Sequence, residues 1–252
     1  MDPTRLRIIQ LPGTGPLANL AIEELLHYSV EHGAPPTVRF WRSERAVVLG
    51  ASRSVYTDVY IDNCRADEVP IFRRHTGGGT VYLHPDVLNF TVIAPYDYPD
   101  IQRYSRIRES LRFILRPVLE ALKRCGVEAD INDKGDIMVE GRKIGGNAQA
   151  RKKRSLLHHG TLMFDAKAGE MSRYLKVPPE RRDISHSDLV AGLCKEGSKV
   201  DEGIIRNISI AGWVKAFNCD GIFYSDISPV DSRSLDDLIV NKYGLTSHIF
   251  KR

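Results

Sequence analysis

Residues 71–89 read IFRRHTGGGTVYLHPDVLN, and three consecutive glycines stand at the centre of this stretch. Arg73 and Arg74 lead into the glycines, and an extended pattern resumes at Val81 and Tyr82. Because glycine loses more backbone entropy on folding than any other residue, three in a row indicate a loop that a ligand approaches closely. Backbone N–H groups of such a loop can bind an anion, and the two arginines can add charge beside it. A hairpin turn with solvated arginines is the alternative, but a tight turn needs only one or two glycines, so the stretch favours a binding loop.

The overall composition is that of an ordinary globular protein. Of the 252 residues, 42% are hydrophobic and 27% are charged, and the formal net charge is +4. A charge this mild suits an anionic small molecule or an acidic partner as well as nucleic acid, so it selects none of them. The apolar runs stop far short of the roughly 20 residues that span a bilayer. The four cysteines are scattered and form no CxxC pair, which predicts neither a zinc site nor a disulfide framework and indicates a reducing cytoplasm.

Hydrophobic spacing predicts a mixture of strands and helices. The clearest helix covers residues 104–125, where apolar side chains recur every three or four positions from Ile107 to Leu122 and Gly126 follows as a stop signal. Strands are expected at residues 6–11, 37–41, 46–49, 70–74, 88–94, 156–164 and 221–224, and further helices at 16–30, 57–67, 168–175, 201–217 and 234–242. The elements do not alternate strictly as βαβ units, and no linker or repeat divides them. We therefore expect one α+β domain over residues 1–252, with a central mixed β-sheet flanked by helices.

Residues 136–149, DIMVEGRKIGGNAQ, hold a second glycine element. They read as a hairpin with arms at residues 136–139 and 142–148. Lys143 in the second arm precedes the pair Gly145-Gly146, an arrangement that suits an anion bound close to the backbone. A β-bulge with a surface lysine explains the same residues equally well.

Two histidines interrupt an apolar strand at His158-His159-Gly160-Thr161. Because side chains alternate between the faces of a strand, only one of the two histidines can face inward. A lone inward histidine is more often part of a hydrogen-bonded core than a catalyst, and no metal-ligand spacing is present. The basic run at residues 151–154 reads most simply as a solvated turn, with a docking patch for an acidic partner as the alternative.

Taken together, the segments RRHTGGGTVY, DIMVEGRKIGGNAQ and HHGTLMFD, in this order and spacing, resemble the three signature blocks of the lipoate–protein ligase A family. Residues 19–24, 40–42 and 48–50 support the resemblance, which extends to about residue 179 and is weak beyond it. That family shares one fold with biotin ligases and octanoyltransferases, and it resembles the catalytic domain of class II aminoacyl-tRNA synthetases. The resemblance therefore implies the same α+β class with a mixed sheet.

The resemblance also implies a reaction and a set of site residues. Such ligases activate lipoate with ATP and Mg²⁺ to lipoyl-adenylate, then pass the lipoyl group to a lysine on the lipoyl domain of a 2-oxoacid dehydrogenase E2 subunit or on a glycine-cleavage H protein. Lys143 matches the essential lysine, whose ammonium would neutralise the carboxylate and the α-phosphate. Asp136 matches an acid that would orient the acceptor amine or bind Mg²⁺, and Tyr82 matches an aromatic residue near the adenine. The remaining matched positions are Arg74, Thr76, Gly77, Gly78, Gly79 and Asn89 around the acyl-adenylate, Gly146 and Asn147 beside the lysine, and His159, Gly160 and Thr161 along the acyl tunnel.

Two features depart from the family pattern. Leu83-His84-Pro85-Asp86 follows the aromatic residue where His-Asp is common, which predicts a different adenine end of the pocket. The chain ends at Arg252, about where the catalytic domain of two-domain ligases stops, so the small accessory domain is expected to be absent. A separate small accessory subunit, or a protein that performs only the transfer from lipoyl-adenylate, would account for that absence.

Two further alternatives stay open. An octanoyl-[acyl carrier protein]:protein octanoyltransferase of the same fold needs a thiolate near the lysine loop, and Cys194 in a loop is the candidate. A non-catalytic binding module, such as a nucleic-acid binder, is the alternative of another class, against which the mild charge and the glycine–lysine loops speak. We therefore expect a cytoplasmic ligase with neither nucleic acid nor a membrane among its partners. The choice between lipoate and octanoate depends on the shape of the tunnel, which the sequence does not specify.

Overall fold

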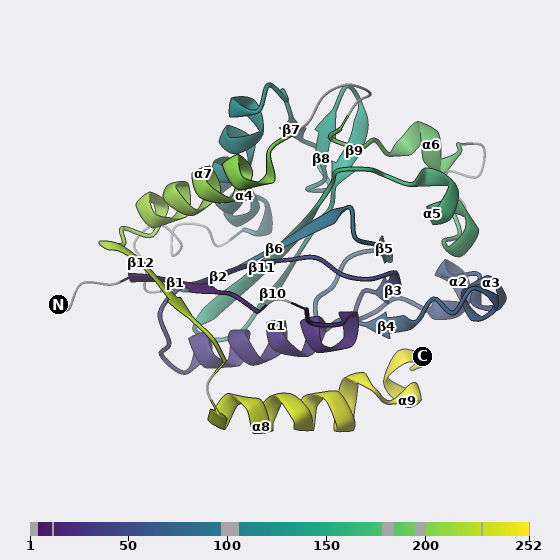
Figure 1. Cartoon of the computed structure of the whole chain (residues 1–252), viewed down its shortest axis with the longest axis horizontal. Coiled ribbons are helices and arrows are strands. Elements are labelled where there is room, and N and C mark those ends of the chain that lie inside the picture. The colour runs from purple at the N-terminus through teal and green to yellow at the C-terminus, as the bar shows by residue number, and fades with distance from the viewer. Residues whose placement is uncertain are drawn as a thin grey trace.

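The computed structural model describes residues 5–11, 13–96, 106–177, 184–194, 200–227 and 229–251. Six strands form its central sheet: β1 (Arg5–Ile9), β2 (Thr37–Trp41), β6 (Val87–Pro95), β10 (Asn147–Arg151), β11 (Ser155–Met163) and β12 (Gly221–Ser225). They lie in the order β10-β11-β6-β2-β1-β12 (Figure 1). β1 runs parallel to β2 and to β12, and the other neighbours pair antiparallel. The predicted α+β class with a central mixed sheet is confirmed.

Helices cover both faces of this sheet (Figure 1). α4 (Ile107–Arg124) and α7 (Glu202–Ala216) pack on one face, and α1 (Pro16–Glu31) packs on the other. Because both faces are covered, β6 is buried along almost its whole length. The helix predicted over residues 104–125 is confirmed from Ile107 onward, residues 104 and 105 lying outside the described residues, although Ile107 itself is exposed.

Two smaller sheets of three strands each carry the glycine elements. The first consists of β3 (Ala46–Leu49), β4 (Ile71–Arg73) and β5 (Val81–Leu83). The second consists of β7 (Asp130–Ile131), β8 (Ile137–Val139) and β9 (Arg142–Gly145). The first glycine loop therefore lies between β4 and β5, and the pair Gly145-Gly146 lies at the end of β9.

The prediction of a single second hairpin arm over residues 142–148 is wrong. β9 ends at Gly145, and the chain then passes into the central sheet as β10. This crossing runs close to β11, because a Cβ at residue 145 would lie 2.2 Å from the carbonyl oxygen of Thr161. Thr161 in turn donates its N–H to the carbonyl oxygen of Gly146 at 3.0 Å. The glycine pair thus allows one stretch of chain to leave one sheet and join another.

The remaining described helices are shorter: α2 (Val55–Asp58), α3 (Ile61–Ala66), α5 (Ala168–Tyr174), α6 (His186–Leu189), α8 (Pro229–Leu238), the π-helical η2 (Ile239–Tyr243) and α9 (Thr246–Ile249). The single helix predicted over residues 57–67 is wrong, because extended Val59 separates α2 from α3 and pairs with Leu175. α6 lies within residues 180–200, and part of that range lies outside the described residues. No described helix combines the length and hydrophobicity needed to cross a membrane.

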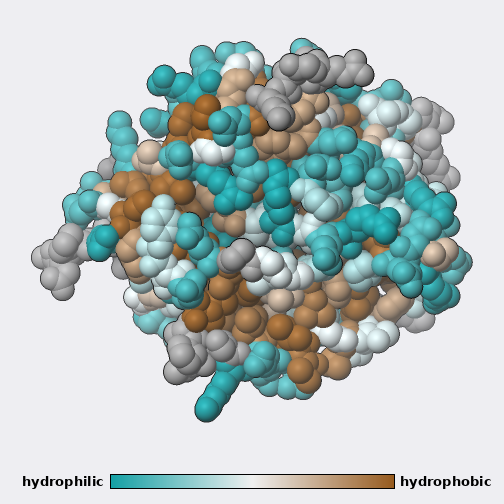
Figure 2. Space-filling model, in the orientation of Figure 1, coloured by the Kyte–Doolittle hydropathy of each residue, from teal (hydrophilic) through white to brown (hydrophobic). Residues whose placement is uncertain are grey.

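The C-terminal part of the chain returns to the first glycine element. α8 lies beside α1, and α9 packs against β4 (Figure 1). On the face that Figure 2 shows, hydrophobic residues gather in the lower part, where α1 and α8 lie in Figure 1, and hydrophilic residues cover most of the right half. The segment from α8 to α9 therefore packs against α1 and against β4, the strand that leads into the first glycine loop.

Candidate active site

A cavity of about 390 Å³ lies between the two glycine elements. Its walls come from segments far apart in the sequence, namely α1, the loop after β4, the turn before β8, the crossing from β9 to β10, and β11. The predicted site residues that line it are Arg74, Gly78, Gly79, Asn89, Asp136, Lys143, Gly146, Asn147, His159, Gly160 and Thr161. The fold thus brings the three sequence blocks onto one cavity.

Thr76 and Tyr82 were also predicted for the site, but neither is among the described residues that line the cavity. Thr76 is buried behind the lining, where its Oγ1 accepts from Arg74 Nε at 2.9 Å and lies 2.8 Å from His159 Nε2. Tyr82 is buried in β5 and donates its hydroxyl to Glu170 at 2.6 Å. Burial and that carboxylate raise the pKa of the Tyr82 phenol. Thr76 therefore supports two lining residues, whereas Tyr82 contributes to the core.

Arg74 holds the glycine loop from inside. Its guanidinium donates to the carbonyl oxygens of Gly77 at 2.6 Å and Gly79 at 2.8 Å. Gly78 has φ +87°, and a Cβ there would lie 3.0 Å from Arg74 Nη2, so this position needs glycine for two reasons. Gly77 shapes the loop without being one of the described lining residues. Burial lowers the pKa of Arg74 to about 10, which leaves the side chain charged at neutral pH.

The expectation that Arg73 also faces an anion is wrong. Its side chain is buried and donates to the carbonyl oxygens of Gly50 at 3.0 Å, His248 at 2.9 Å and Ile249 at 2.5 Å. The donors that a ligand would need are therefore used to fasten the C-terminal segment to β4. Of the two arginines, Arg74 alone lines the cavity within the described part of the chain.

Lys143 and Asp136 form an ion pair at the rim of the cavity, with Nζ 2.7 Å from Oδ1. Their side chains are 35% and 22% exposed, so both can meet a ligand. The main chain of Lys143 is fixed on two sides, since it pairs with Met138 and its carbonyl oxygen accepts the N–H of Ala191 at 2.9 Å. A Cβ at residue 146 would lie 2.9 Å from Lys143 Nζ, so Gly146 makes room for the ammonium group.

Glu23 of α1 is a buried carboxylate in the cavity wall and was not among the predicted site residues. Its Oε2 lies 2.7 Å from His159 Nδ1, and its Oε1 accepts from Trp41 Nε1 at 3.3 Å and from the Thr91 hydroxyl. Burial alone raises the pKa of Glu23, but His159, by charge and hydrogen bond, and the bond from Thr91 lower it to about 2. The carboxylate is therefore ionised at neutral pH. A signal was available in the sequence, because Glu23 stands three residues after Leu20, on the same helix face.

The two adjacent histidines have different surroundings, as strand alternation predicted. His158 is fully buried, and its ring nitrogens bond Gln149 Nε2 and Asn147 Oδ1, both at 3.1 Å. Burial lowers the pKa of His158 to about 3, so it is neutral. His159 lines the cavity instead. Gly160 follows the two histidines in β11. Its lack of a side chain makes room for the neighbouring strand β10, because a Cβ at residue 160 would lie 2.2 Å from Asn147 Oδ1.

No cysteine lines the cavity in the part of the chain that the structure describes. Cys194 is exposed and follows α6, where its N–H donates to the carbonyl oxygen of Phe164 at 3.0 Å. The described residues also contain no group of three or more His, Cys, Asp or Glu side chains placed to hold a metal ion. The cavity therefore presents two lysines, carboxylates and a backbone loop, and no thiolate nucleophile from the described cysteines.

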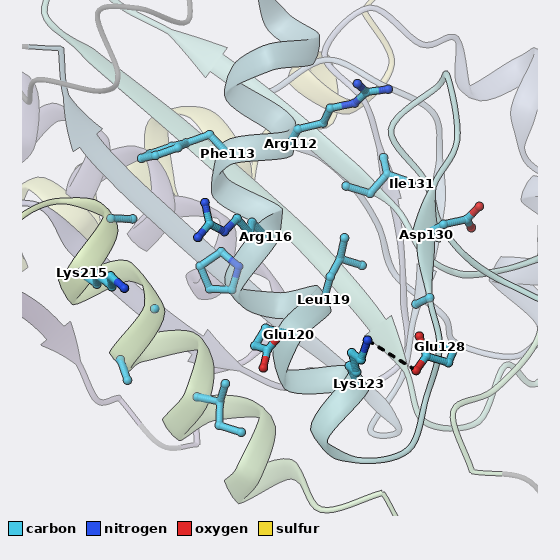
Figure 3. A pocket seen from close by; sticks show the side chains of 16 residues that line it. Arg112, Phe113, Arg116, Leu119, Glu120, Lys123, Glu128, Asp130, Ile131 and Lys215 are labelled. Atoms are coloured by element: carbon cyan, nitrogen blue, oxygen red, sulfur yellow. Dashed lines mark ion pairs between the residues drawn. The ribbon is translucent and has the colours of Figure 1, made fainter.

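A larger groove of about 1100 Å³ lies between α4, α7 and β7 (Figure 3). In Figure 3 Arg116 of α4 lies between Lys215 of α7 and Asp130 of β7, and Lys123 pairs with Glu128 at 4.0 Å. Neither glycine element contributes to its lining. We therefore place the chemistry in the smaller cavity.

Fold and site together define a catalytic α+β domain in which two glycine elements and a lysine enclose a cavity. The chain belongs to the lipoyl protein ligase A/B catalytic domain family, whose family model matches residues 15–217. The family predicted from the three sequence blocks is confirmed.

Three curated relatives illustrate the range of the family. The chain is 33% identical to lipoate-protein ligase LplJ of Bacillus subtilis over 168 residues, which are 66% of this chain and 48% of that protein. It therefore spans about half the length of that relative. It is 29% identical to lipoate-protein ligase A subunit 1 of Thermoplasma acidophilum over 229 residues, 86% of this chain and 85% of that protein. It is also 29% identical to octanoyltransferase LipM of Bacillus anthracis over 227 residues, 80% of each.

Two solved structures agree with this assignment. Lipoate-protein ligase A bound with ATP matches with a TM-score of 0.82 and 26% identity, and the match covers 98% of each chain. A bi-partite lipoate protein ligase of Thermoplasma acidophilum, studied with its E2 lipoyl domain, also gives a TM-score of 0.82 and 26% identity over 98% of this chain and 96% of that one. The match along nearly the whole chain includes the part beyond residue 179, where the sequence resemblance was weak.

Proposed function

We propose that the protein is a lipoate–protein ligase, which activates lipoate with ATP and transfers the lipoyl group to a lysine of an acceptor protein. The observation that carries the proposal is the Lys143–Asp136 pair at the rim of a cavity whose buried wall holds Glu23 and His159. An acid bound with its carboxylate at Lys143 would extend into the enclosed part of the cavity. The related ligases, one of them bound with ATP, support lipoate and ATP as the substrates.

In the first step, a carboxylate oxygen of lipoate attacks the α-phosphorus of ATP. The bond from that phosphorus to its bridging oxygen breaks, and pyrophosphate leaves with the electron pair. Two anionic groups must approach each other, so the ammonium of Lys143 would lower their repulsion. The backbone at Gly78 and Gly79 can approach the phosphates because neither residue carries a side chain.

In the second step, the amine of an acceptor lysine attacks the carbonyl carbon of lipoyl-adenylate. AMP leaves with the electron pair of the C–O bond, and the amine gives up one proton to form the amide. Lys143 would polarise the carbonyl oxygen during this attack. Asp136, 2.7 Å from Lys143, would orient the incoming amine.

Asp136 also fits a role toward the Mg²⁺ that accompanies ATP. Mg²⁺ in nucleotide sites usually takes one or two carboxylates together with phosphate and water oxygens. Asp136 offers one partly exposed carboxylate, whose Oδ1 faces Lys143 and whose Oδ2 accepts from Asn132 Nδ2 at 3.4 Å. Mg²⁺ would add positive charge beside the phosphates, and the residue set suits an ion that arrives with the nucleotide.

Lipoyl domains of 2-oxoacid dehydrogenase E2 subunits, or H proteins of the glycine-cleavage system, are the proposed acceptors. The bi-partite ligase of Thermoplasma acidophilum and its E2 lipoyl domain support this choice. That ligase is bi-partite, and the Thermoplasma acidophilum relative described above is named subunit 1. Both observations support a separate small accessory subunit for this chain.

An octanoyltransferase is the second candidate, because LipM of Bacillus anthracis matches 80% of this chain. A thioester mechanism needs an activated thiolate at the cavity. The described lining contains no cysteine, and Cys194 is exposed. The ligase is therefore the function that the geometry supports better.

Mass spectrometry of a lipoyl-domain acceptor tests the proposal. The acceptor is incubated with the protein, lipoate and Mg-ATP, and in parallel with octanoyl-acyl carrier protein without ATP. An ATP-dependent lipoyl mass gain is expected. A gain only from chemically made lipoyl-adenylate would indicate that activation needs a partner or that the protein performs transfer alone. Octanoyl transfer without ATP would overturn the proposal that the protein is a ligase.

A further inference from the structure

The turn between β7 and β8 is held more firmly than an exposed turn requires. The carboxamide oxygen of Asn132 accepts the N–H groups of Lys134 and Asp136, both at 2.9 Å. The carbonyl oxygen of Gly135 accepts from Asn147 Nδ2 at 2.8 Å, which ties the turn to the start of β10. These bonds connect the turn to Asp136 and Asn147, two residues that line the cavity.

Helix α4 holds the same turn from the other side. Gly135 has φ +86°, and a Cβ there would lie 2.5 Å from Leu111 Cδ1, so the backbone packs directly on the helix. Asp133 pairs with Arg108 of α4 at 3.4 Å. Because these contacts hold the backbone on both sides of residue 134, they fix the position of the Lys134 Cα relative to the cavity.

Lys134 is the side chain that this turn presents to the cavity. It lines the cavity together with Asp136 and Lys143. The neighbouring carboxylate, that of Asp133, pairs with Arg108 and not with Lys134. Within the described ranges, no carboxylate forms an ion pair with Lys134, so its ammonium is available to a ligand.

The rim of the cavity thus carries two ammonium groups, those of Lys134 and Lys143, and the carboxylate of Asp136. Lys143 is the less exposed of the two lysines and is paired with Asp136. In a nucleoside triphosphate the β- and γ-phosphates extend away from the bond-forming α-phosphorus, and pyrophosphate must leave on that side. Lys134 is exposed at the rim and has no described ion-pair partner, so its ammonium can bind the negative charge of those phosphates.

We propose that Lys134 binds the β- and γ-phosphates of the nucleotide and stabilises pyrophosphate as it leaves. The inference rests on the proposed function and divides the work between two lysines. Lys143 serves the carboxylate and the α-phosphate, and Lys134 serves the leaving group. Lys134 makes charge-assisted hydrogen bonds to phosphate oxygens and forms no covalent bond.

Calorimetric binding of ATP, pyrophosphate and AMP to wild type and to Lys134→Gln tests the inference. The variant is expected to bind ATP and pyrophosphate about tenfold more weakly, because one charge-assisted contact is lost. Binding of AMP is expected to stay unchanged, since AMP lacks the β- and γ-phosphates. Lys134→Arg, which keeps the charge, should recover most of the ATP affinity.

Lys215→Gln is the matched control, because it removes a lysine from the distant groove of Figure 3 and should leave all three affinities unchanged. If Lys134→Gln binds ATP as wild type does, the inference fails and the proposed function stands. An equal loss of AMP binding also overturns it, because the effect would then concern the nucleoside or the turn itself. A wild-type protein that binds neither ATP nor pyrophosphate overturns the inference, and transfer from chemically made lipoyl-adenylate then decides the proposed function separately.

Discussion

Glu23 Oε2 lies 2.7 Å from His159 Nδ1, although 136 residues separate the two in the chain. The contact joins α1 to β11 in the buried wall of the cavity. Thr76 bonds the other ring nitrogen of His159 at 2.8 Å, and Arg74 donates to Thr76 at 2.9 Å. A continuous chain of polar contacts therefore runs from α1 to the first glycine loop, so the loop is positioned partly by a carboxylate on another element.

Glu23→Gln is expected to reduce the pH dependence of stability. The pKa of Glu23 in the folded protein, about 2, lies below its ordinary value of 4.5. The ionised carboxylate therefore stabilises the fold above about pH 4.5, and this contribution is lost as the pH falls from there toward 2. The difference corresponds to on the order of 3 kcal/mol. Urea unfolding between pH 7 and pH 3 should show a steeper decline for wild type than for the variant.

The control for this measurement is Glu120→Gln, since Glu120 is half exposed on α4 and remote from the cavity. It is expected to follow the wild-type curve. Parallel curves for wild type and Glu23→Gln would show that the contact with His159 contributes no pH-dependent stability.

Lys143→Ala is expected to lower ATP-dependent lipoylation by at least roughly a thousandfold, because both steps lose the ammonium group proposed to face the reacting carboxylate and carbonyl. Stability should change by less than about 1 kcal/mol, since the side chain is partly exposed and paired with a partly exposed Asp136. Mass spectrometry of the acceptor and thermal unfolding measure the two effects. Lys215→Ala, a lysine outside the cavity, should retain full activity. Undiminished lipoylation by Lys143→Ala would contradict the proposed mechanism.

Gly146→Ala is expected to impair catalysis without unfolding the protein. The added Cβ would lie 2.9 Å from Lys143 Nζ, and the flexible lysine would move away rather than the backbone. Displacing a reacting group by about an ångström costs roughly a hundredfold in rate. Gly169→Ala is the matched control, because a Cβ at that position meets nothing within 4 Å. Equal rates for the two variants would mean that the position of the ammonium group is not critical.

Cys194→Ala separates the ligase from the octanoyltransferase. The thiol is exposed and is not among the residues that line the cavity, so its removal should leave lipoylation within about twofold of wild type. A thioester enzyme that used Cys194 would lose transfer altogether. The assay is acyl transfer to a lipoyl domain from lipoate with ATP and from octanoyl-acyl carrier protein.

Local patterns predicted much of the fold. The apolar spacing of α4 and the continuous apolar run of β6 were readable because each reflects burial against a neighbouring layer. The extended break at Val59 was not readable, since pairing with Leu175, more than a hundred residues away, overrides the local helical tendency. The passage from β9 to β10 at the glycine pair was missed for the same reason, because strand partners are non-local.

The candidate site divides in a similar way. Lys143 and the glycine loop stood out because glycines clustered beside charged residues have no use in a core. Glu23 carried a weaker signal, its place on the same helix face as Leu20, and this does not separate it clearly from other charged residues of an amphipathic helix. Local composition does not distinguish Arg73 from Arg74, and only the family resemblance singled out Arg74. In the structure Arg73 fastens the C-terminal segment and Arg74 shapes the loop.

The sequence by itself determined the class of the fold, the family and the lysine on which the proposed chemistry depends. These follow from periodicity, from glycine's backbone freedom and from the order of three motifs, all of which are properties of short stretches. Only the tertiary structure decided that Glu23 meets His159, that Tyr82 lies outside the cavity lining, and that a fastened turn presents Lys134 beside Lys143. The physical reason is that burial and hydrogen-bond partners are set by segments remote in the chain, and these partners decide which charged side chains are left for a ligand.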